Sequence, residues 1–318
     1  MKSIRLTHIL PIIILILLSS CSLSSCSVFK FGENHTKNKL KRANLEYNTL
    51  DTKNYKFTYW DTGESDKPVL VLFHGFGTST HLQWYQQAKM LSKTHRLILP
   101  NLLYFGSTPK GQKKYGVQEQ AAAMSILLKE LKIDSMILGG LSYGGAVAAE
   151  LTMLEKDKVQ KLAIFASPVK FFKDTDLSDT ETKFDVKDIS ELLVPKDIAM
   201  TQKFADVVLY KDKKLPKFIL KDVQKNLFQN ETNRHNCKAI LQDLEINKKD
   251  LRNRKYQFDC PVLLIWGEDD ELIPARIGKD LKDYLPTSEL CIIPKAGHCV
   301  NIEQKKMFNK ALSNFLKN

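Results

Sequence analysis

The chain has 318 residues and a formal net charge of +12, from 48 Lys and Arg against 36 Asp and Glu. An apolar fraction of 43% is enough for a sizeable core, and 26% charged residues is ordinary for a globular protein, so composition excludes a mainly disordered or collagen-like chain. The excess charge comes from lysines spread along the chain, without a nucleic-acid-binding motif, so we expect no nucleic-acid partner. The length fits one large domain, or a core with an inserted subdomain, and we expect a monomer.

Residues 1–20 are predicted to be a lipoprotein signal peptide. Lys2 and Arg5 precede an apolar run over 9–18, which is shorter than the about 20 residues of a spanning helix. The run is followed by L-S-S-C ending at Cys21, which resembles the lipobox of bacterial lipoproteins and implies lipidation of that cysteine. A second L-S-S-C ends at Cys26, and a plain secretory signal or an uncleaved anchor are the other interpretations. In every case we expect the rest of the chain in the cell envelope, outside the cytoplasm and attached to a membrane.

A polar, lysine-rich stretch follows and leads into the domain. Its composition predicts a basic tether over residues 21–44, which would also favour contact with anionic lipid headgroups. The remaining cysteines are Cys237, Cys260, Cys291 and Cys299; their spacing gives neither a disulfide framework nor a metal-binding pair. We expect Cys260 and Cys291, which lie in apolar runs, to be buried thiols.

Strand and helix patterns then alternate in chain order. Short apolar or alternating runs predict strands, and longer runs with helical spacing predict helices. This alternation predicts a mostly parallel sheet with helices on both faces. The predicted strands are 55–60, 69–73, 96–99, 135–138, 161–165, 262–266 and 290–293, and the predicted helices are 81–91, 117–131, 143–154, one from 275, and 304–316.

One long segment interrupts the alternation. Residues 168–256 contain no buried-strand run, only helical patterns rich in Lys and Asp. A region of this length is too long for a loop in a compact domain. We therefore predict a helical cap over 168–256, inserted between two parts of an eight-stranded α/β core at 45–167 and 257–318.

The pattern G-L-S-Y-G at residues 140–144 is the first candidate for chemistry. Such a pattern also occurs by chance, but here a strand precedes it and a helix follows it. In this context the glycines permit a turn tight enough to expose the hydroxyl of Ser142 as a nucleophile.

A serine hydroxyl needs a base, and the base needs an orienting carboxylate. Among seven histidines, His298 stands in a loop between the last predicted strand and the last helix. The stretch W-G-E-D-D at 266–270 leaves a buried strand, and we choose Asp270 as the carboxylate, with Asp269 and then Glu268 as alternatives. The chain order Ser, Asp, His is one of the known orders of such a triad.

The stretch H-G-F-G at 74–77 follows another predicted strand. Backbone amides in a glycine-rich loop can stabilise the negative charge of a tetrahedral intermediate, and we assign the amides of Phe76 and Tyr143 to that role. His74 is interpreted as a residue that holds the loop by hydrogen bonds rather than as a base.

Together these motifs make the chain, from about residue 54 to its end, resemble the α/β-hydrolase superfamily near its monoacylglycerol-lipase-like branch. The resemblance implies Asp270 as the acid, since the family's carboxylate stands three residues after the strand-end glycine. One departure is Asn101, where the family usually has Asp, which affects local hydrogen bonding. The motifs that carry the resemblance are H-G-F-G at 74–77, L-L-Y-F-G-S at 102–107, G-L-S-Y-G at 140–144, W-G-E-D-D at 266–270 and G-H at 297–298.

These observations predict a serine ester hydrolase that needs no cofactor or metal. We expect short- to medium-chain esters and monoacylglycerols as substrates, because the cap segment is rich in apolar residues. The alternatives are a hydrolase of C–C or other acyl bonds with the same triad, a non-catalytic ligand-binding protein of this fold, and an envelope protein that holds anionic polymer on its basic surface.

Overall fold

The computed structural model describes residues 27–211 and 214–317. The predicted signal peptide and both candidate lipidation cysteines lie outside these ranges. The described residues form one nine-stranded sheet with the order β1-β2-β4-β3-β6-β7-β8-β9, in which short β5 pairs with β2. Pairings from β4 to β9 are parallel, whereas β1, β4 and β5 run antiparallel to β2. The strands are β1 Glu46–Asp51, β2 Tyr55–Asp61, β3 Val69–Phe73, β4 Arg96–Pro100, β5 Thr108–Pro109, β6 Met136–Leu141, β7 Val159–Phe165, β8 Val262–Gly267 and β9 Glu289–Ile293.

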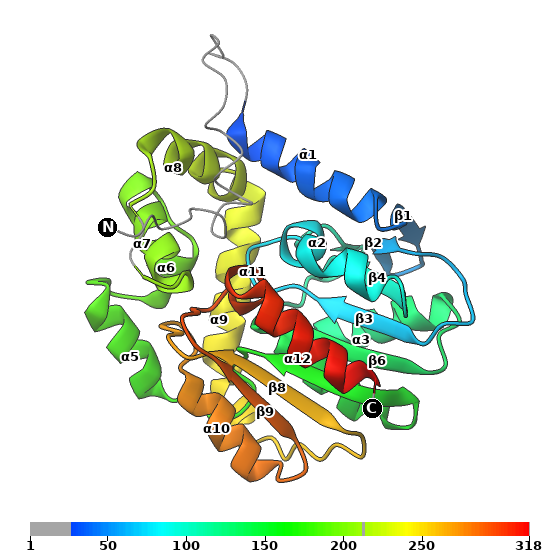
Figure 1. Cartoon of the computed structure of the whole chain (residues 1–318). Helices are drawn as coiled ribbons and strands as arrows, with labels where there is room; N and C mark the ends of the chain where they lie inside the picture. The colour runs from blue at the N-terminus through cyan, green and yellow to red at the C-terminus, as the bar shows by residue number, and fades with distance from the viewer. Residues whose placement is uncertain (1–26, 212–213, 318) are drawn as a thin grey trace, which may run out of the picture.

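Helices cover both faces of this sheet (Figure 1). Successive side chains of a strand point to opposite faces, and in β3 Val71 and Phe73 join one apolar layer while Leu70 and Leu72 join the other. The first layer includes residues of α3, α4 and α10, and the second includes residues of α2, α11 and α12. The predicted α/β fold is therefore confirmed. These helices are α2 Thr80–Leu91, α3 Val117–Glu130, α4 Tyr143–Leu154, α10 Ala275–Tyr284, α11 Val300–Glu303 and α12 Lys305–Lys317, with a 3₁₀ turn, η1, at Lys156–Lys158.

The cap consists of helices between β7 and β8 (Figure 1). Only a few of its residues are fully buried, because it covers one end of the core rather than forming a core of its own. None of the helices in the described ranges is both long and apolar enough to cross a membrane. The cap helices are α5 Asp174–Lys183, α6 Ile189–Leu193, α7 Ile198–Val208, α8 Lys217–Val223, the π-helical turn η2 Gln224–Phe228 and α9 Glu231–Asn253.

The structure corrects the expected basic tether. Residues Val28–Lys41 form a helix, α1, which lies along α2 and reaches α8 of the cap (Figure 1). Ser27 caps its N-terminus by accepting a hydrogen bond from the amide of Lys30, and Leu40 is fully buried. The helix was not predicted because its sequence is mostly polar, and of its residues only Thr36 and Leu40 are buried.

The sheet has nine strands rather than the predicted eight, and β1 and β5 were not among the predicted elements. β1 is an edge strand whose residues are all exposed or half-buried, and β5 has two residues, so neither produces an apolar run. The parallel strands all end at the same edge of the sheet. This edge, below the cap, brings together the loops that follow β3, β6, β8 and β9.

Candidate active site

Ser142 stands at the sharp turn between β6 and α4. Its backbone has φ 55° and ψ −122°, a strained conformation for a residue other than glycine. The turn is held by the Ser142 amide, which donates to the carbonyl of Phe165 at 2.8 Å, and by the hydroxyl of Ser167, which donates to the Ser142 carbonyl at 2.7 Å. The predicted strand–turn–helix is thus present, and it projects the serine from a rigid base.

Close backbone contacts explain why glycines flank this serine. A Cβ on Gly140 would lie 2.1 Å from the carbonyl oxygen of Gly144. A Cβ on Gly144 would lie 2.4 Å from the carbonyl oxygen of His74. A Cβ at such distances would push the backbone segments apart, so glycine at both positions lets the turn form without this strain.

The loops after β8 and β9 bring Asp270 and His298 together. Asp270 Oδ2 lies 2.8 Å from His298 Nδ1, and both side chains are buried. The other carboxylate oxygen accepts hydrogen bonds from the amides of Leu272 at 3.0 Å and Ile273 at 2.9 Å. Because a carboxylate accepts at both oxygens, His298 Nδ1 must donate, and in the neutral imidazole this tautomer has an unprotonated Nε2 that can accept a proton. Asp269 and Glu268, the alternative carboxylates, are exposed and make no side-chain hydrogen bond within the described residues.

The amides of Phe76 and Tyr143 border the same site. Phe76 lies in the loop after β3, and Tyr143 is the first residue of α4, where backbone amides have no partner within the helix. Neither amide hydrogen-bonds to another group of the residues described. Two free amides beside a serine can donate to an oxyanion.

His74 holds the loop that carries Phe76. Its ring is fully buried; Nδ1 lies 2.7 Å from the carbonyl oxygen of Gly75, and Nε2 accepts from the amide of Leu102 at 3.0 Å. Burial lowers the pKa of His74 to about 4, so its imidazole is neutral at pH 7. The interpretation of His74 as a loop-fixing residue is confirmed, since both of its nitrogens are occupied by backbone groups.

Asn101, where the resemblance implies Asp, uses both ends of its side-chain amide in hydrogen bonds. Its Oδ1 accepts from the amide of Thr80 at 3.1 Å, and its Nδ2 donates to the hydroxyl of Thr58 at 3.0 Å. An amide has one donor and one acceptor end, which matches these two partners.

Ser142, His298 and Phe76 line a cavity of about 1110 Å³ between the core and the cap. Its volume slightly exceeds the usual range for small-molecule sites, roughly 300–1,000 Å³. Most of the wall is apolar. Side chains of α1, the cap helices and the loops between them contribute Phe29, Phe172, Leu177, Ile189, Leu193, Phe204, Val208, Leu209, Leu215, Leu220, Val223, Leu227, Leu241 and Leu244.

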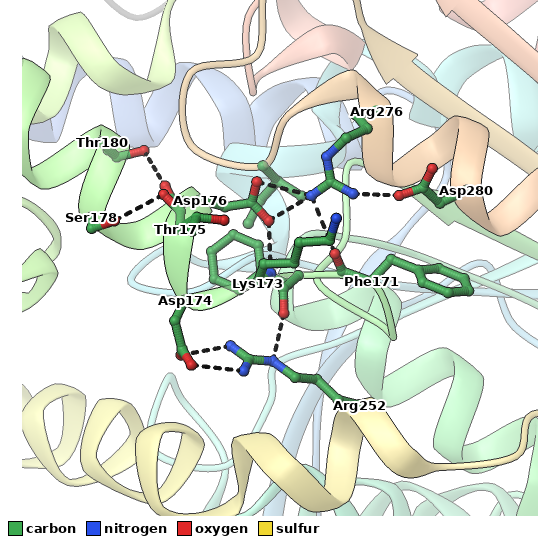
Figure 2. Close-up of polar contacts among 12 residues, drawn as sticks. Phe171, Lys173, Asp174, Thr175, Asp176, Ser178, Thr180, Arg252, Arg276 and Asp280 are labelled. Atoms are coloured by element: carbon green, nitrogen blue, oxygen red, sulfur yellow. Dashed lines mark hydrogen bonds and ion pairs between the residues drawn. The ribbon is translucent and has the colours of Figure 1, made fainter.

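The cap is bonded to the loop that carries Asp270. Figure 2 shows Arg276, in α10 shortly after this loop, donating to both carboxylate oxygens of Asp176 in α5, at 2.7 and 2.9 Å. The hydroxyl of Thr180, also in α5, donates to the carbonyl of Glu271 at 3.0 Å. Helix α5 therefore braces the loop directly beside the acid.

A second set of bonds connects the cap to the loop of His298. The carboxylate of Glu303 accepts from the amide of Gly297 at 2.8 Å and from the amide of Tyr210 in the cap at 2.7 Å. The amide of Cys299 donates to the carbonyl of Val208 at the end of α7, at 3.2 Å. Sequence reasoning missed these positioning residues, because their partners are distant in the chain and belong to no motif.

The cap is also stabilised internally by charged pairs that border the cavity. Arg252 of α9 forms a bidentate pair with Asp174 of α5 (Figure 2). It also donates to the carbonyl of Phe172 at 2.6 Å. Lys248 lies 2.9 Å from Asp174. Lys248 also pairs with Glu245, so two carboxylates balance these two cations where they face the cavity.

The four described cysteines are free thiols, each half-buried. Burial raises the pKa of Cys260 to about 11 and also raises that of Cys291. The expectation of buried thiols was therefore too strong for both. Cys260 lies just before β8 and Cys291 lies in β9 at the edge of the sheet. In the described ranges, no group of three or more His, Cys, Asp or Glu is placed to hold a metal ion.

The chain belongs to the alpha/beta hydrolase fold family, whose model matches residues 68–305. It is similar to 2-hydroxy-6-oxo-2,4-heptadienoate hydrolase of Pseudomonas putida, at 24% identity over 80% of this chain and 91% of that protein. It is also similar to Lipase 1 of Psychrobacter immobilis, at 25% identity over 78% of this chain and 76% of the relative. Among solved structures, a membrane phospholipase A described as a bacterial virulence factor shares the fold, with a TM-score of 0.74, 20% identity and coverage of 90% of each chain. Membership in this family supports a hydrolase.

Proposed function

We propose that this protein is a serine ester hydrolase that acts through an acyl-enzyme on Ser142. The observation that carries the proposal is that His298, paired with Asp270, lines one cavity together with Ser142 on its strained turn. A nucleophile, a base with its orienting acid, and two free amides are the groups that acyl transfer requires.

The mechanism follows from the protonation state of His298. Its Nε2 takes the proton of the Ser142 hydroxyl as Oγ attacks the ester carbonyl carbon. The amides of Phe76 and Tyr143 donate to the oxyanion, and Asp270 stabilises the imidazolium. The C–O bond to the alcohol then breaks, and the alcohol leaves with the proton from His298. Water, deprotonated by the same nitrogen, attacks the acyl carbon. The bond from that carbon to Ser142 Oγ then breaks, His298 returns the proton to Oγ, and the acid is released.

The apolar wall of the cavity supports an amphiphilic ester, such as a monoacylglycerol, as the substrate. Each methylene buried there contributes at most about 0.8 kcal/mol, or about fourfold in kcat/KM, so acetyl to octanoyl esters should show rising activity. The cavity volume does not restrict the acyl chain to short lengths. We expect activity to rise at least to octanoyl, and monoacylglycerols to be cleaved faster than charged or triacyl esters.

The test combines a covalent probe with a substrate series. A fluorophosphonate should label the wild type and not the Ser142→Ala variant; an unlabelled wild type would instead indicate a non-catalytic binding protein or a holder of anionic polymer. With acetyl, butyryl, octanoyl and palmitoyl esters, a flat kcat/KM profile would contradict an apolar acyl pocket. A maximum at palmitoyl would indicate a lipase for long chains.

A second candidate is C–C bond hydrolysis with the same triad, because one relative is a 2-hydroxy-6-oxo-dienoate hydrolase. Its substrate is an anion, which would need a cation in the cavity. Three basic side chains line the cavity, and two of them, Lys248 and Arg252, are already paired with Asp174. Cleavage of a 2-hydroxy-6-oxo-dienoate with higher kcat/KM than any ester of the series would favour this candidate.

We further propose that the protein is a lipoprotein of the cell envelope, attached to a membrane through Cys21. The L-S-S-C sequence after a short apolar run supports this location. Metabolic labelling with palmitate should mark the wild type and not the Cys21→Ala variant. Label that persists on this variant would assign the lipid to Cys26.

A further inference from the structure

We infer that the junction of α1 with α8 is a docking surface for an anionic lipid bilayer, which places the cavity beneath the membrane. This inference goes beyond the proposed hydrolysis, since it does not depend on which bond is cleaved, and its choice of occupant rests on the proposed lipid attachment. It begins from two large apolar side chains, Phe31 in α1 and Phe218 in α8, each 53% exposed.

The two helices are bonded to each other at their meeting point. The hydroxyl of Ser27 lies 2.9 Å from both carboxylate oxygens of Asp222 in α8 and donates to this carboxylate, which also accepts from the amide of Phe29. Phe31 lies one helical turn after Ser27, and Phe218 lies one turn before Asp222. Both exposed aromatic rings therefore belong to the same junction, which Figure 1 shows at one end of the molecule.

Positive charge surrounds these rings. Lys217, Lys221 and Lys225 recur every four residues along α8 and η2, and all three are exposed. None of them forms an ion pair with an acid that the structure describes, nor does Lys30 beside Phe31. The only acid in this helical segment is Asp222, which is already bonded to Ser27. Exposed aromatic rings among unpaired lysines are typical of a surface that binds anionic lipid.

The opposite face of the same helices lines the cavity. Leu220, Val223 and Leu227 follow helical spacing on α8 and η2 and line the cavity, as does Phe29 of α1. The segment is thus amphipathic, with a basic outer row and an apolar inner row. One layer of helix separates the proposed bilayer contact from the interior that contains Ser142.

The position of the N-terminus supports a bilayer as the occupant. Residue 26 directly precedes this junction, and Cys21 lies only six residues before Ser27. Six extended residues span about 20 Å. A lipid attached to either cysteine would hold this face, rather than the opposite end of the core, close to the membrane.

The test uses tryptophan fluorescence of the full chain on vesicles. The native tryptophans Trp60, Trp84 and Trp266 are buried. Quenching by the vesicles therefore acts mainly on the indole that Phe218→Trp introduces at the surface. Its matched control is Leu154→Trp: Leu154 is 56% exposed and ends α4, about 18 Å along the helix from Ser142. Vesicles of phosphatidylglycerol and phosphatidylcholine carry brominated acyl chains that quench inserted indoles.

We expect strong quenching of the F218W protein on these vesicles, little quenching of the L154W protein, and a loss of the difference on pure phosphatidylcholine. Adding Lys217→Gln, Lys221→Gln and Lys225→Gln to F218W should lower the ratio of docked to undocked protein about a hundredfold, because each lysine near the surface contributes about fivefold.

A second triple variant controls for the loss of charge itself. Lys53→Gln, Lys93→Gln and Lys132→Gln, added to F218W, remove the same charge from exposed lysines elsewhere and should leave quenching unchanged. Equal quenching of F218W and L154W, or no quenching of either, would overturn the docking surface. The latter result is also expected if the segment before Ser27 or a second copy of the chain covers the patch. Hydrolysis of a water-soluble ester without vesicles should be unaffected by either triple variant, which separates this test from that of the proposed function.

Discussion

Replacing Asp270 by Asn should remove most activity while leaving the fold intact. In the wild type, one carboxylate oxygen accepts from the amides of Leu272 and Ile273, and the other faces His298 Nδ1 at 2.8 Å. In the variant, the amide oxygen must keep the position facing the two backbone donors, because an NH₂ group there would face two N–H groups. The NH₂ group then donates to His298 Nδ1.

This orientation forces the wrong tautomer of His298. An Nδ1 that accepts leaves the proton on Nε2, which can then no longer accept the proton of Ser142. For a triad of this kind the loss is about 10⁴ in rate, equivalent to about 5 kcal/mol of transition-state stabilisation. The assay is kcat/KM for a butyryl ester, with circular dichroism and thermal unfolding to verify that the variant is folded.

The matched control is Asp269→Asn. Asp269 is exposed and makes no side-chain hydrogen bond to a described residue, so its replacement should change kcat/KM less than about twofold. A folded Asp270→Asn protein within tenfold of the wild type would refute the tautomer argument. If the two variants exchanged their effects, the acid would be Asp269.

Three further predictions follow from contacts around the site. Asp176→Asn should weaken the pair with partly exposed Arg276 and lower the free energy of unfolding in urea by about 1–2 kcal/mol. In steady-state kinetics it should lower kcat more than it raises KM. An unchanged kcat would show that the pair contributes to stability and not to positioning the acid. The pKa of His74 is about 4 in the folded protein and 6.5 in the unfolded chain. The stabilisation that the neutral imidazole gives is therefore present above pH 6.5, and up to about 3 kcal/mol of the free energy of unfolding is lost as the pH falls towards 4. Between pH 7 and 4.5, the free energy of unfolding in urea should fall less in His74→Gln than in the wild type. An equal fall in the two proteins would contradict this. Gly144→Ala should destabilise the turn by about 1–3 kcal/mol and reduce fluorophosphonate labelling of Ser142, and wild-type labelling would argue against the steric constraint.

Local sequence patterns were sufficient where a signal is contained in one short segment. The buried parallel strands appear as continuous apolar runs because both of their faces are covered, and helix α4 has the predicted bounds of 143–154. The turn at Ser142 was predictable because its close backbone contacts require glycines at fixed positions. The role of His74 was also predictable, since it follows a strand in a glycine-rich loop.

Elements that depend on distant partners had no such signal. Helix α1 buries little apolar surface, and its position depends on contacts to α2 in the core and to Asp222 in the cap. The edge strand β1 exists because β2 lies beside it, not because its residues form an apolar run. Both were therefore absent from the predicted elements.

For the candidate site, the sequence by itself determined which residue types could perform acyl transfer and in which loops they lie. Only the tertiary structure decided that Asp270, and not its exposed neighbours, pairs with His298, because this choice depends on the direction in which one turn presents its side chains. The structure alone also revealed that Asp176 and Thr180 connect the cap to the loop of the acid, and that Glu303, shortly after the base, accepts from Tyr210 of the cap. These bonds join residues about a hundred positions apart, and no local pattern of apolar or polar residues encodes a contact over that separation.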